Sequence, residues 1–190
     1  TGKVNFANSI ISYFSIIASL GIGTYAIRGA AKVRDNKKEL SKFTKEILCI
    51  NLISTAVAYL CFFITLRFSV KLQDYTRLLI ICSASILLGT LGIGWLYSAL
   101  EEYAYITLRS LSFQVLSIIL LFAFVKTKDD YIKYAAIAVI SSAGSNILNL
   151  IHSRKYINIF SKVKLNLKQH LKPIFILFVT SVAINIFTIL

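Results

Sequence analysis

The sequence is poor in the residues from which catalytic and metal sites are built. Its 190 residues include no methionine, one proline, three cysteines, two histidines and only eight acidic residues. The cysteines form no C-x-x-C pair and the histidines lie far apart, so the spacing argues against a zinc site. No G-x-x-x-x-G-K-[ST] loop is present, which excludes a P-loop ATP motor in this chain. We therefore expect no metal, no cofactor and no enzymatic centre, with the cysteines as packing residues and the histidines solvated.

Charged residues are also scarce, whereas apolar ones are abundant. Only 15% of the residues are charged, 57% are hydrophobic and the mean hydropathy is +0.74, while soluble domains have roughly 25% charged residues. The composition excludes an ordinary soluble domain and predicts an integral membrane protein. The uncharged stretches are too long and too uniformly apolar for barrel strands, so we expect an all-α bundle of transmembrane helices.

Six stretches are long enough to cross a membrane, for which a helix needs roughly 20 apolar residues. The fourth includes Arg109, whose long side chain can snorkel or face the protein interior. Pro173 is predicted to begin the last helix, where its missing N–H costs least. The sequence thus predicts one transmembrane domain over residues 1–190, with spans at residues 4–27, 47–66, 78–100, 106–125, 132–151 and 173–190.

The basic residues are unevenly distributed between the two sides that this topology defines. Residues 28–46, 101–109 and 152–172 share one side and hold fourteen of the 21 Lys and Arg residues. Because Lys and Arg are retained on the cytoplasmic side, these connections are predicted to be cytoplasmic and Thr1 to lie outside. Topology and attraction to membrane lipids then explain the net charge of +13. In the absence of a groove-reading motif, we expect no nucleic-acid partner.

The two ends of the sequence suggest a longer protein. The chain begins with Thr1, contains no methionine and ends within an apolar run. An outside amino terminus would be explained by one earlier span that returns the start of the protein to the cytoplasm. We therefore expect this sequence to be a fragment.

A short motif, LGIG, occurs twice, at residues 20–23 and 91–94. Both copies lie in spans that are predicted to run inward, and each comes before charged residues. We interpret the motif as the inner end of a repeated span and predict parallel repeats of a two-helix hairpin, with a weaker third copy around Gly144. Repeated helices are frequent in transporters, although small residues also recur in membrane helices because they permit close packing.

Several segments resemble the Wzx-type polysaccharide (O-antigen) flippases of the multidrug/oligosaccharidyl-lipid/polysaccharide (MOP) exporter superfamily. The resemblance extends over essentially the whole chain, and it rests on residues 5–28, 31–42, 91–110, 124–131 and 141–157. It implies a MATE/MOP-like amino-terminal lobe, roughly the first half of such a protein, without its first helix and its second lobe.

This resemblance implies a transporter in the bacterial cytoplasmic (inner) membrane that is not an enzyme. Its cargo would be an oligosaccharide on undecaprenyl pyrophosphate, moved outward for the biosynthesis of O-antigen or capsule, and other polysaccharide-assembly membrane proteins would be its partners. Two alternatives remain: a membrane-embedded glycosyltransferase or polymerase acting on the same substrate, and a MATE-type drug or cation exporter.

Candidate site residues are basic and amide side chains in or beside the spans. A guanidinium can bind a phosphate through two hydrogen bonds, so Arg28 and Arg109 are candidates, although each can also snorkel to the interface. Amides on polar helical stripes turn away from lipid, either towards a sugar site or towards neighbouring helices. The sugar-site candidates are Asn51, Gln114, Asn146 and Asn149.

Ion coupling would require a carboxylate within the bundle. The acids near the spans all lie at span ends, and they are Glu46, Asp74, Glu101, Glu102, Asp129 and Asp130. We select Glu101 because the resembling family often has an acid after the aromatic segment at this point. The alternative is that Glu101 is a solvated loop residue.

Overall fold

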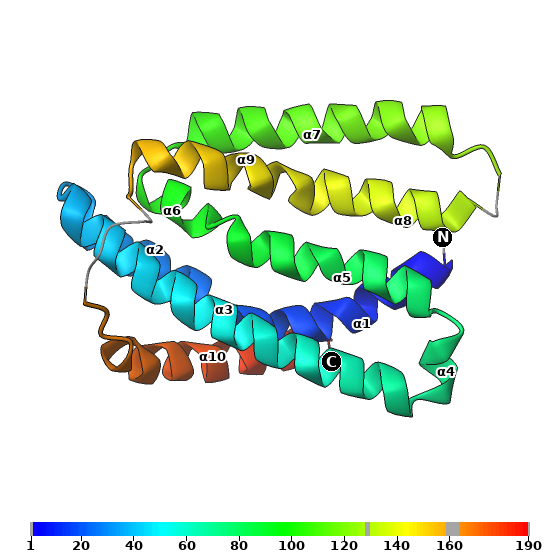
Figure 1. Ribbon diagram of the computed structural model, residues 1–190, viewed down its shortest axis with the longest axis horizontal. Coiled ribbons are helices and arrows are strands. Elements are labelled where there is room, and N and C mark those ends of the chain that lie inside the picture. The colour runs from blue at the N-terminus through cyan, green and yellow to red at the C-terminus, as the bar shows by residue number, and fades with distance from the viewer. Residues whose placement is uncertain (1, 128–129, 159–163, 190) are drawn as a thin grey trace.

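The computed structural model describes residues 2–127, 130–158 and 164–189, without the side chains of residues 181, 182 and 184–189. Helices lie side by side along the long axis of the molecule, with α7 at one edge and α10 at the other (Figure 1). The α-helices are α1 (Gly2–Ser19), α2 (Ile22–Val33), α3 (Lys37–Phe68), α4 (Val70–Gln73), α5 (Thr76–Leu91), α6 (Gly94–Ala99), α7 (Tyr103–Phe124), α8 (Tyr131–Val139), α9 (Ser145–His152) and α10 (Lys168–Ile189). A π-helical segment, η2 (Ile140–Gly144), joins α8 to α9, and a 3₁₀ turn, η3 (Ser153–Lys155), follows α9.

Five stretches in the described part of the chain are long and apolar enough to span a membrane, and they make the chain a multi-pass membrane protein. They are Gly2–Val33, Lys37–Phe68, Thr76–Ala99, Tyr103–Phe124 and Tyr131–Lys155. Each contains or closely matches one of the first five predicted spans. The sixth prediction, residues 173–190, falls partly outside the described residues and stays a prediction.

The start of α10 differs from the prediction. The helix begins at Lys168 and contains Pro173 in its interior, so the expectation that Pro173 would begin this helix was wrong. Uncharged sequence marks where the apolar part of a helix begins, but a polar first turn can precede it.

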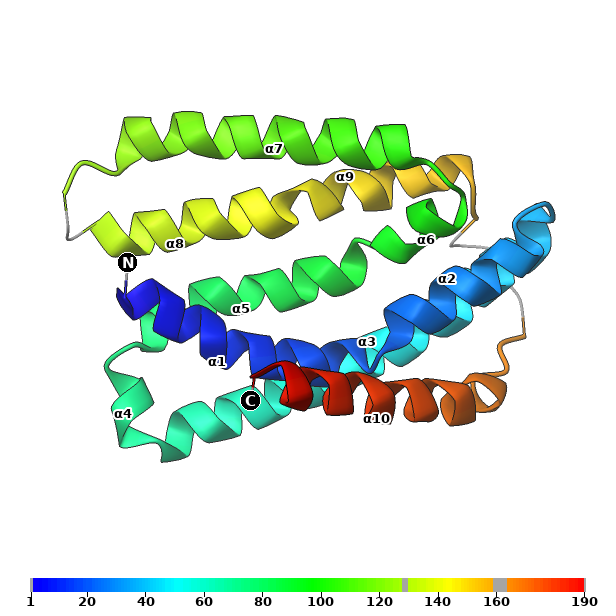
Figure 2. The same cartoon turned by 180° about the vertical axis from the view of Figure 1, so that it is seen from behind.

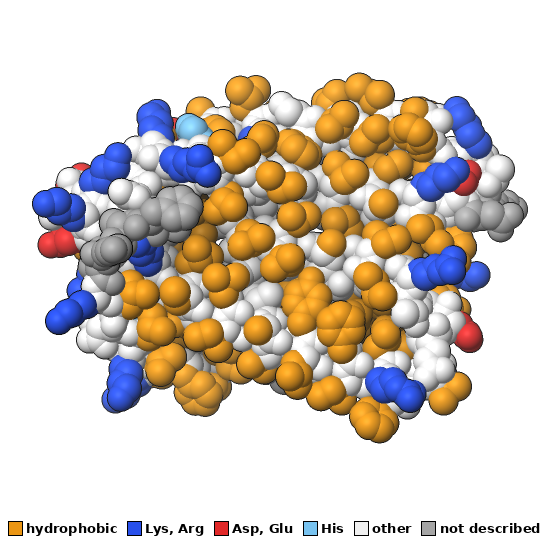
Figure 3. All heavy atoms as spheres, viewed as in Figure 1, with side chains coloured by type: hydrophobic (Ala, Val, Ile, Leu, Met, Phe, Trp, Pro, Cys, Tyr) orange, Lys and Arg blue, Asp and Glu red, His pale blue; other side chains and the backbone are white. Residues whose placement is uncertain are grey.

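Lys and Arg side chains gather at the two ends of the molecule, and an apolar band separates them (Figure 3). At one end, Arg34 forms an ion pair with Glu101 at 2.7 Å, and the hydrogen bond from Arg34 to Glu101 raises the pKa of Arg34. At the same end, Lys37 Nζ donates to the carbonyl of Lys155 at 3.1 Å. Contacts therefore join all three connections that the charge distribution assigns to the cytoplasm.

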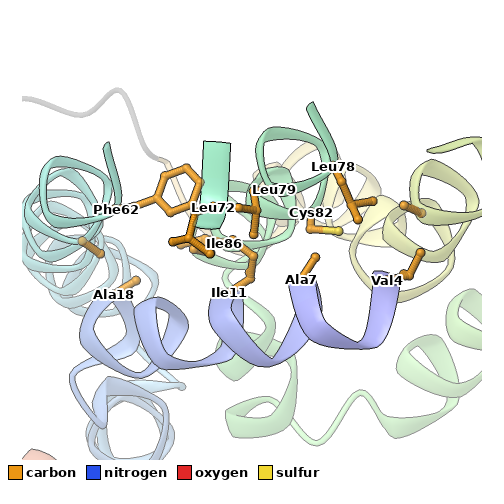
Figure 4. Close-up of a cluster of buried hydrophobic side chains, with 12 residues drawn as sticks. Val4, Ala7, Ile11, Ala18, Phe62, Leu72, Leu78, Leu79, Cys82 and Ile86 are labelled. Atoms are coloured by element: carbon orange, nitrogen blue, oxygen red, sulfur yellow. The ribbon is translucent and has the colours of Figure 1, made fainter. Parts of the chain in front are cut away.

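The opposite half of the bundle, which is predicted to be the outer half, has a packed apolar core. Small and branched side chains of α1, including Val4, Ala7 and Ile11, point towards α3, α4 and α5 (Figure 4). Phe62 of α3 is almost fully buried. Its ring packs edge to face on the ring of Phe14, with the two ring centroids 5.4 Å apart. Packing of this kind holds α1, α3, α4 and α5 together at this end of the described chain.

Helix α3 begins with a side-chain cap. The Asn36 side chain accepts hydrogen bonds from the backbone N–H groups of Lys38 at 3.1 Å and Glu39 at 3.3 Å. Asparagine is one of the residue types that favour the start of a helix. The cap fixes the point at which the chain turns back from α2 into α3.

Replacing Asn36 with alanine is expected to lower the free energy of unfolding by about 1 kcal/mol, because two N–H groups lose their acceptor. Chemical unfolding followed by circular dichroism in detergent would measure this change. Asn36→Asp, which keeps the acceptor and adds a charge that the helix start favours, should retain the stability. An equal loss in both variants would contradict the capping role.

Both LGIG copies interrupt a helix inside a membrane span. The first separates α1 from α2, with φ of 44° at Leu20 and 65° at Gly21, and the second separates α5 from α6, with φ of 37° at Ile93. Figure 2 shows the change of direction at both points. The motif lies in the second half of both stretches, and its place at the inner end of a span stays a prediction. A positive φ is unusual for a branched residue such as Ile93, and such strain is concentrated at functional sites.

The third, weaker copy of the motif coincides with a third irregularity. Gly144 ends the π-helical segment η2, and π-helical turns inside α-helices often occur at functional sites. The predicted repeat of whole hairpins stays a prediction. Within the described residues, the three related segments share an interrupted α-helix.

Candidate functional site

A cavity of about 380 Å³, which we call the polar cavity, lies at the two LGIG breaks. Six helices contribute to it, and the described residues that line it are all uncharged. They are Ser15, Ala18, Ser19, Ile22, Gly23, Asn51, Ser85, Ile86, Gly89, Thr90, Gly94, Trp95 and Asn146. The cavity lining therefore combines hydroxyl and amide residues with the indole-bearing Trp95.

The helix breaks explain why a polar cavity can exist within apolar, membrane-spanning stretches of the chain. Interrupted membrane helices release backbone N–H and C=O groups, which are tolerated where they line a cavity. Helix α2 starts after Gly21 with no side-chain cap, and its first residues, Ile22 and Gly23, line the cavity. The N–H groups of this first turn bring a partial positive charge to the cavity wall.

Two buried polar groups at the cavity have no hydrogen-bond partner in the described part of the chain. They are Oδ1 of Asn51 and Nε1 of Trp95, one acceptor and one donor. Asn51 is only 8% exposed, so its acceptor is held where leaving it unbonded costs about 1–3 kcal/mol.

Hydrogen bonds hold the walls around these groups. Thr55 of α3 and Thr90 of α5 join their hydroxyls at 2.7 Å, and Ser54 Oγ donates to the Ala18 carbonyl of α1 at 2.6 Å. Thr90 and Trp95 were not among the candidates predicted from the sequence. The signal available was the motif itself, because both residues lie within one position of the second LGIG copy.

The wall formed by α9 is fixed by close packing against the second break. A Cβ placed on Gly92 would lie 2.4 Å from Cβ of Asn146, so only glycine permits this approach. Asn149 is fully buried, and its Nδ2 donates to Oδ1 of Asn146 at 3.4 Å. The Tyr97 hydroxyl donates to the Asn149 carbonyl at 2.6 Å. Asn149 thus supports Asn146, which lines the cavity.

The structure places the predicted basic residues away from the polar cavity. Arg28 is exposed and lies with Lys32 and Tyr25 in a second cavity of about 520 Å³, between α2, α3 and α10. We call it the basic cavity. Arg109, on α7, is half-buried, with its guanidinium 5.9 Å from the ring of Tyr105. Its Nε and Nη1 have no partner among the described residues.

The remaining two candidates lie outside both cavities. Gln114 is exposed on α7, a helix that buries little of its surface. Glu101 has a side chain that is 63% exposed and pairs with Arg34 at the end of the bundle that is predicted to be cytoplasmic. The structure therefore brings Asn51 and Asn146 together at one cavity, supported by Asn149, and leaves Gln114 and Glu101 at the surface.

Sequence reasoning missed a buried cluster of titratable side chains, Tyr25, Glu46 and His170, which we call the histidine cluster. Glu46 and His170 are 2% and 4% exposed, so the expectation that both histidines are solvated was wrong. His170 Nε2 lies 2.8 Å from Glu46 Oε2, and His170 Nδ1 lies 2.7 Å from the Tyr25 hydroxyl. No local signal joins residues so far apart in sequence.

Comparison with known proteins gives one finding. The model of the family described as polysaccharide biosynthesis protein matches the chain over residues 1–190. No curated protein and no solved structure matches it. The match confirms the resemblance that the sequence segments indicate. The chain belongs to the polysaccharide biosynthesis protein family, the family of Wzx-type flippases within the MOP superfamily.

Proposed function

We propose that the chain forms one lobe of a flippase that moves undecaprenyl-pyrophosphate-linked oligosaccharide units across the bacterial cytoplasmic membrane. The observation that carries the proposal is the polar cavity at the two helix breaks, which is lined by hydroxyl and amide residues together with Trp95. A sugar unit offers hydroxyls that both donate and accept. Its apolar ring face can pack on the indole of Trp95, as aromatic rings supply large apolar surface with a polar handle.

The uncharged lining of the polar cavity favours a carbohydrate cargo over the drug or cation of a MATE-type exporter. A drug or cation exporter would hold its positive cargo with acidic or purely apolar side chains, whereas the described lining residues are hydroxyls, amides and small apolar groups. The polymerase alternative has less support, since the described acids near the outer end include Asp130, which is engaged with Lys133 at 2.7 Å. That ion pair holds the pKa of Asp130 well below its usual range.

The pyrophosphate would bind nearer the cytoplasm. Arg28 and Lys32 lie one helical turn apart on α2 and line the basic cavity together, where a diphosphate could pair with both charges. Arg109 is the second candidate, because its unpaired guanidinium N–H groups suit a phosphate oxygen. Arg28 and Arg109, which the sequence also indicated, are thus the proposed phosphate-binding residues.

An apolar groove supplies a route for the lipid tail. It measures about 420 Å³ and is lined by Ile17, Leu20, Ile50, Ile53, Ser54, Val57, Leu167 and Leu171. The groove lies across the α1–α3 contact from the polar cavity, because Ser54 in the groove bonds to Ala18 of the cavity wall. Head and tail of one amphipathic cargo could thus occupy adjoining spaces.

The cavity residues can be tested by transport of a lipid-linked oligosaccharide in reconstituted vesicles. Asn51→Ala and Asn146→Ala are each expected to lower the transport rate about tenfold, since one lost hydrogen bond near 1.4 kcal/mol corresponds to a factor of ten. Asn8→Ala is the matched control, because Asn8 is exposed on α1 outside the cavity. Unchanged transport in both cavity variants would refute the sugar site.

A further inference from the structure

The histidine cluster ties three helices together near the cytoplasmic end. Tyr25 belongs to α2, Glu46 to α3 and His170 to α10. The Glu46 carboxylate also accepts from the backbone N–H of Asn166 at 2.8 Å and from Gln169 Nε2 at 3.2 Å. Because these contacts fasten the start of α10 to both α2 and α3, a change in the cluster acts on the relative position of all three helices.

The geometry defines where a proton would bind. An ionised carboxylate only accepts hydrogen bonds, so Nε2 of His170 carries the hydrogen that faces Glu46. Nδ1 is then the acceptor of the Tyr25 hydroxyl. A proton added to Nδ1 turns the neutral imidazole into an imidazolium paired with Glu46, and the Tyr25 oxygen changes from donor to acceptor. Proton uptake thereby replaces a buried single charge with a buried ion pair.

Charged groups near the cluster come from the same three helices. Arg28 and Lys32 of α2 share the basic cavity with Tyr25, and Lys42 and Lys45 lie within one turn of Glu46 on α3. Lys168 and Lys172 flank His170 on α10. These cations oppose the imidazolium and favour the Glu46 anion, but water and salt screen the exposed ones.

The cluster also adjoins the basic cavity, because Tyr25 belongs to both. The basic cavity is bounded by the same three helices, with Tyr25 on α2, Phe43 on α3 and Leu177 on α10. Pro173 follows His170 by three residues and itself lines the basic cavity, and a proline inside a helix removes one backbone hydrogen bond and permits bending. Beyond the cavity, the backbone of Leu177 packs on Gly21 at the first break.

We propose that the histidine cluster is a proton-binding site whose occupancy sets the position of α10 against α2 and α3, and thereby the width of the basic cavity. The protonated state holds α10 close through the ion pair between His170 and Glu46. Loss of the proton weakens that attachment and lets α10 move about Pro173. The inference goes beyond the proposed function and does not depend on the identity of the cargo.

Proton binding is measured directly by nuclear magnetic resonance of the ring nitrogens in ¹⁵N-histidine-labelled protein. The chain has two histidines, so His152→Gln assigns the signals. We expect His170 to take up a proton at Nδ1 with acidification, and Glu46→Gln to weaken this uptake because the imidazolium loses its partner. Uptake that Glu46→Gln leaves unchanged, or no uptake in the folded protein, would overturn the proposal.

The coupled movement is measured with spin labels on Lys32→Cys and Ile176→Cys, after Cys49, Cys61 and Cys82 are replaced with alanine. Both labelled positions line the basic cavity. The distance between the two spin labels is expected to shorten as pH falls. The midpoint of this change should coincide with the pH at which His170 takes up its proton. His170→Gln should abolish the change and His152→Gln should retain it.

For a His170 variant that does not fold, Tyr25→Phe serves instead and should shift the midpoint of the distance change. A pH-independent distance in the parent protein, or an unaltered midpoint in Tyr25→Phe, would refute the coupling. No cargo is present, so neither result bears on the proposed transport.

Discussion

Transport of lipid-linked oligosaccharide is expected to fall about 100-fold or more when Gly89 is replaced by phenylalanine, without a loss of stability. Gly89 lies within α5 and lines the polar cavity, and a Cβ built on it meets no atom within 4 Å. A phenyl ring at this position therefore fills cavity space and leaves the packing between helices intact. Displacing contacts worth about 2.8 kcal/mol corresponds to a factor of 100.

Stability separates this effect from misfolding. Replacing a glycine inside a helix removes its entropic disadvantage of about 1 kcal/mol, so Gly89→Phe should unfold at the same temperature as the parent or higher. Gly2→Phe is the control, since a Cβ on Gly2 is also unobstructed but lies outside the cavity. Vesicle transport and thermal unfolding are measured on the same preparations. Full transport by a stably folded Gly89→Phe variant would exclude the polar cavity as the path of the cargo.

Alanine is expected to destabilise the fold at the first glycine of each LGIG copy and to be tolerated at the second. Gly21 has a φ of 65°, and a Cβ there would lie 3.0 Å from the carbonyl carbon of Leu177. Gly92 approaches Asn146 so closely that an added Cβ overlaps it at 2.4 Å. A left-handed backbone costs alanine roughly 1–2 kcal/mol, and overpacking typically costs 1–3 kcal/mol.

Gly21→Ala and Gly92→Ala should therefore each lower the unfolding temperature by about 5 °C, at roughly 2–4 °C per kcal/mol for a chain of this size. The matched controls are Gly23→Ala and Gly94→Ala, which occupy the second glycine of the same motifs and meet nothing within 4 Å. Thermal unfolding followed by circular dichroism compares the four variants. Equal losses at first and second glycines would show that the breaks do not depend on these contacts.

Much of the architecture is predictable because membrane spans are encoded locally. Length and hydropathy are sufficient to locate five spans, and the distribution of Lys and Arg correctly groups the connections that meet at one end. The break at LGIG was not predictable in the same way. Hydropathy reports what a segment can bury, whereas the positive φ values of Leu20, Gly21 and Ile93 are imposed by packing against other helices.

The candidate site likewise contains residues that the local sequence pattern predicts and residues that only tertiary packing brings together. Asn51 and Asn146 were selected because polar side chains on a helical stripe must avoid lipid, and both line the polar cavity. Gln114 satisfied the same rule, yet it is exposed on α7. The histidine cluster could not be found from local pattern, because Glu46 and His170 are 124 residues apart and each lies beside basic residues that suggest a solvated loop.

Protection of the polar cavity by the cargo is the most direct test of the account. In protein whose three native cysteines are replaced with alanine, Gly89→Cys is labelled with a small thiol reagent in the presence and absence of lipid-linked oligosaccharide. We predict that saturating cargo slows labelling of Gly89→Cys at least tenfold and leaves Gly2→Cys unaffected. Equal labelling rates of Gly89→Cys with and without the cargo would contradict the central claim that the sugar binds at the paired helix breaks.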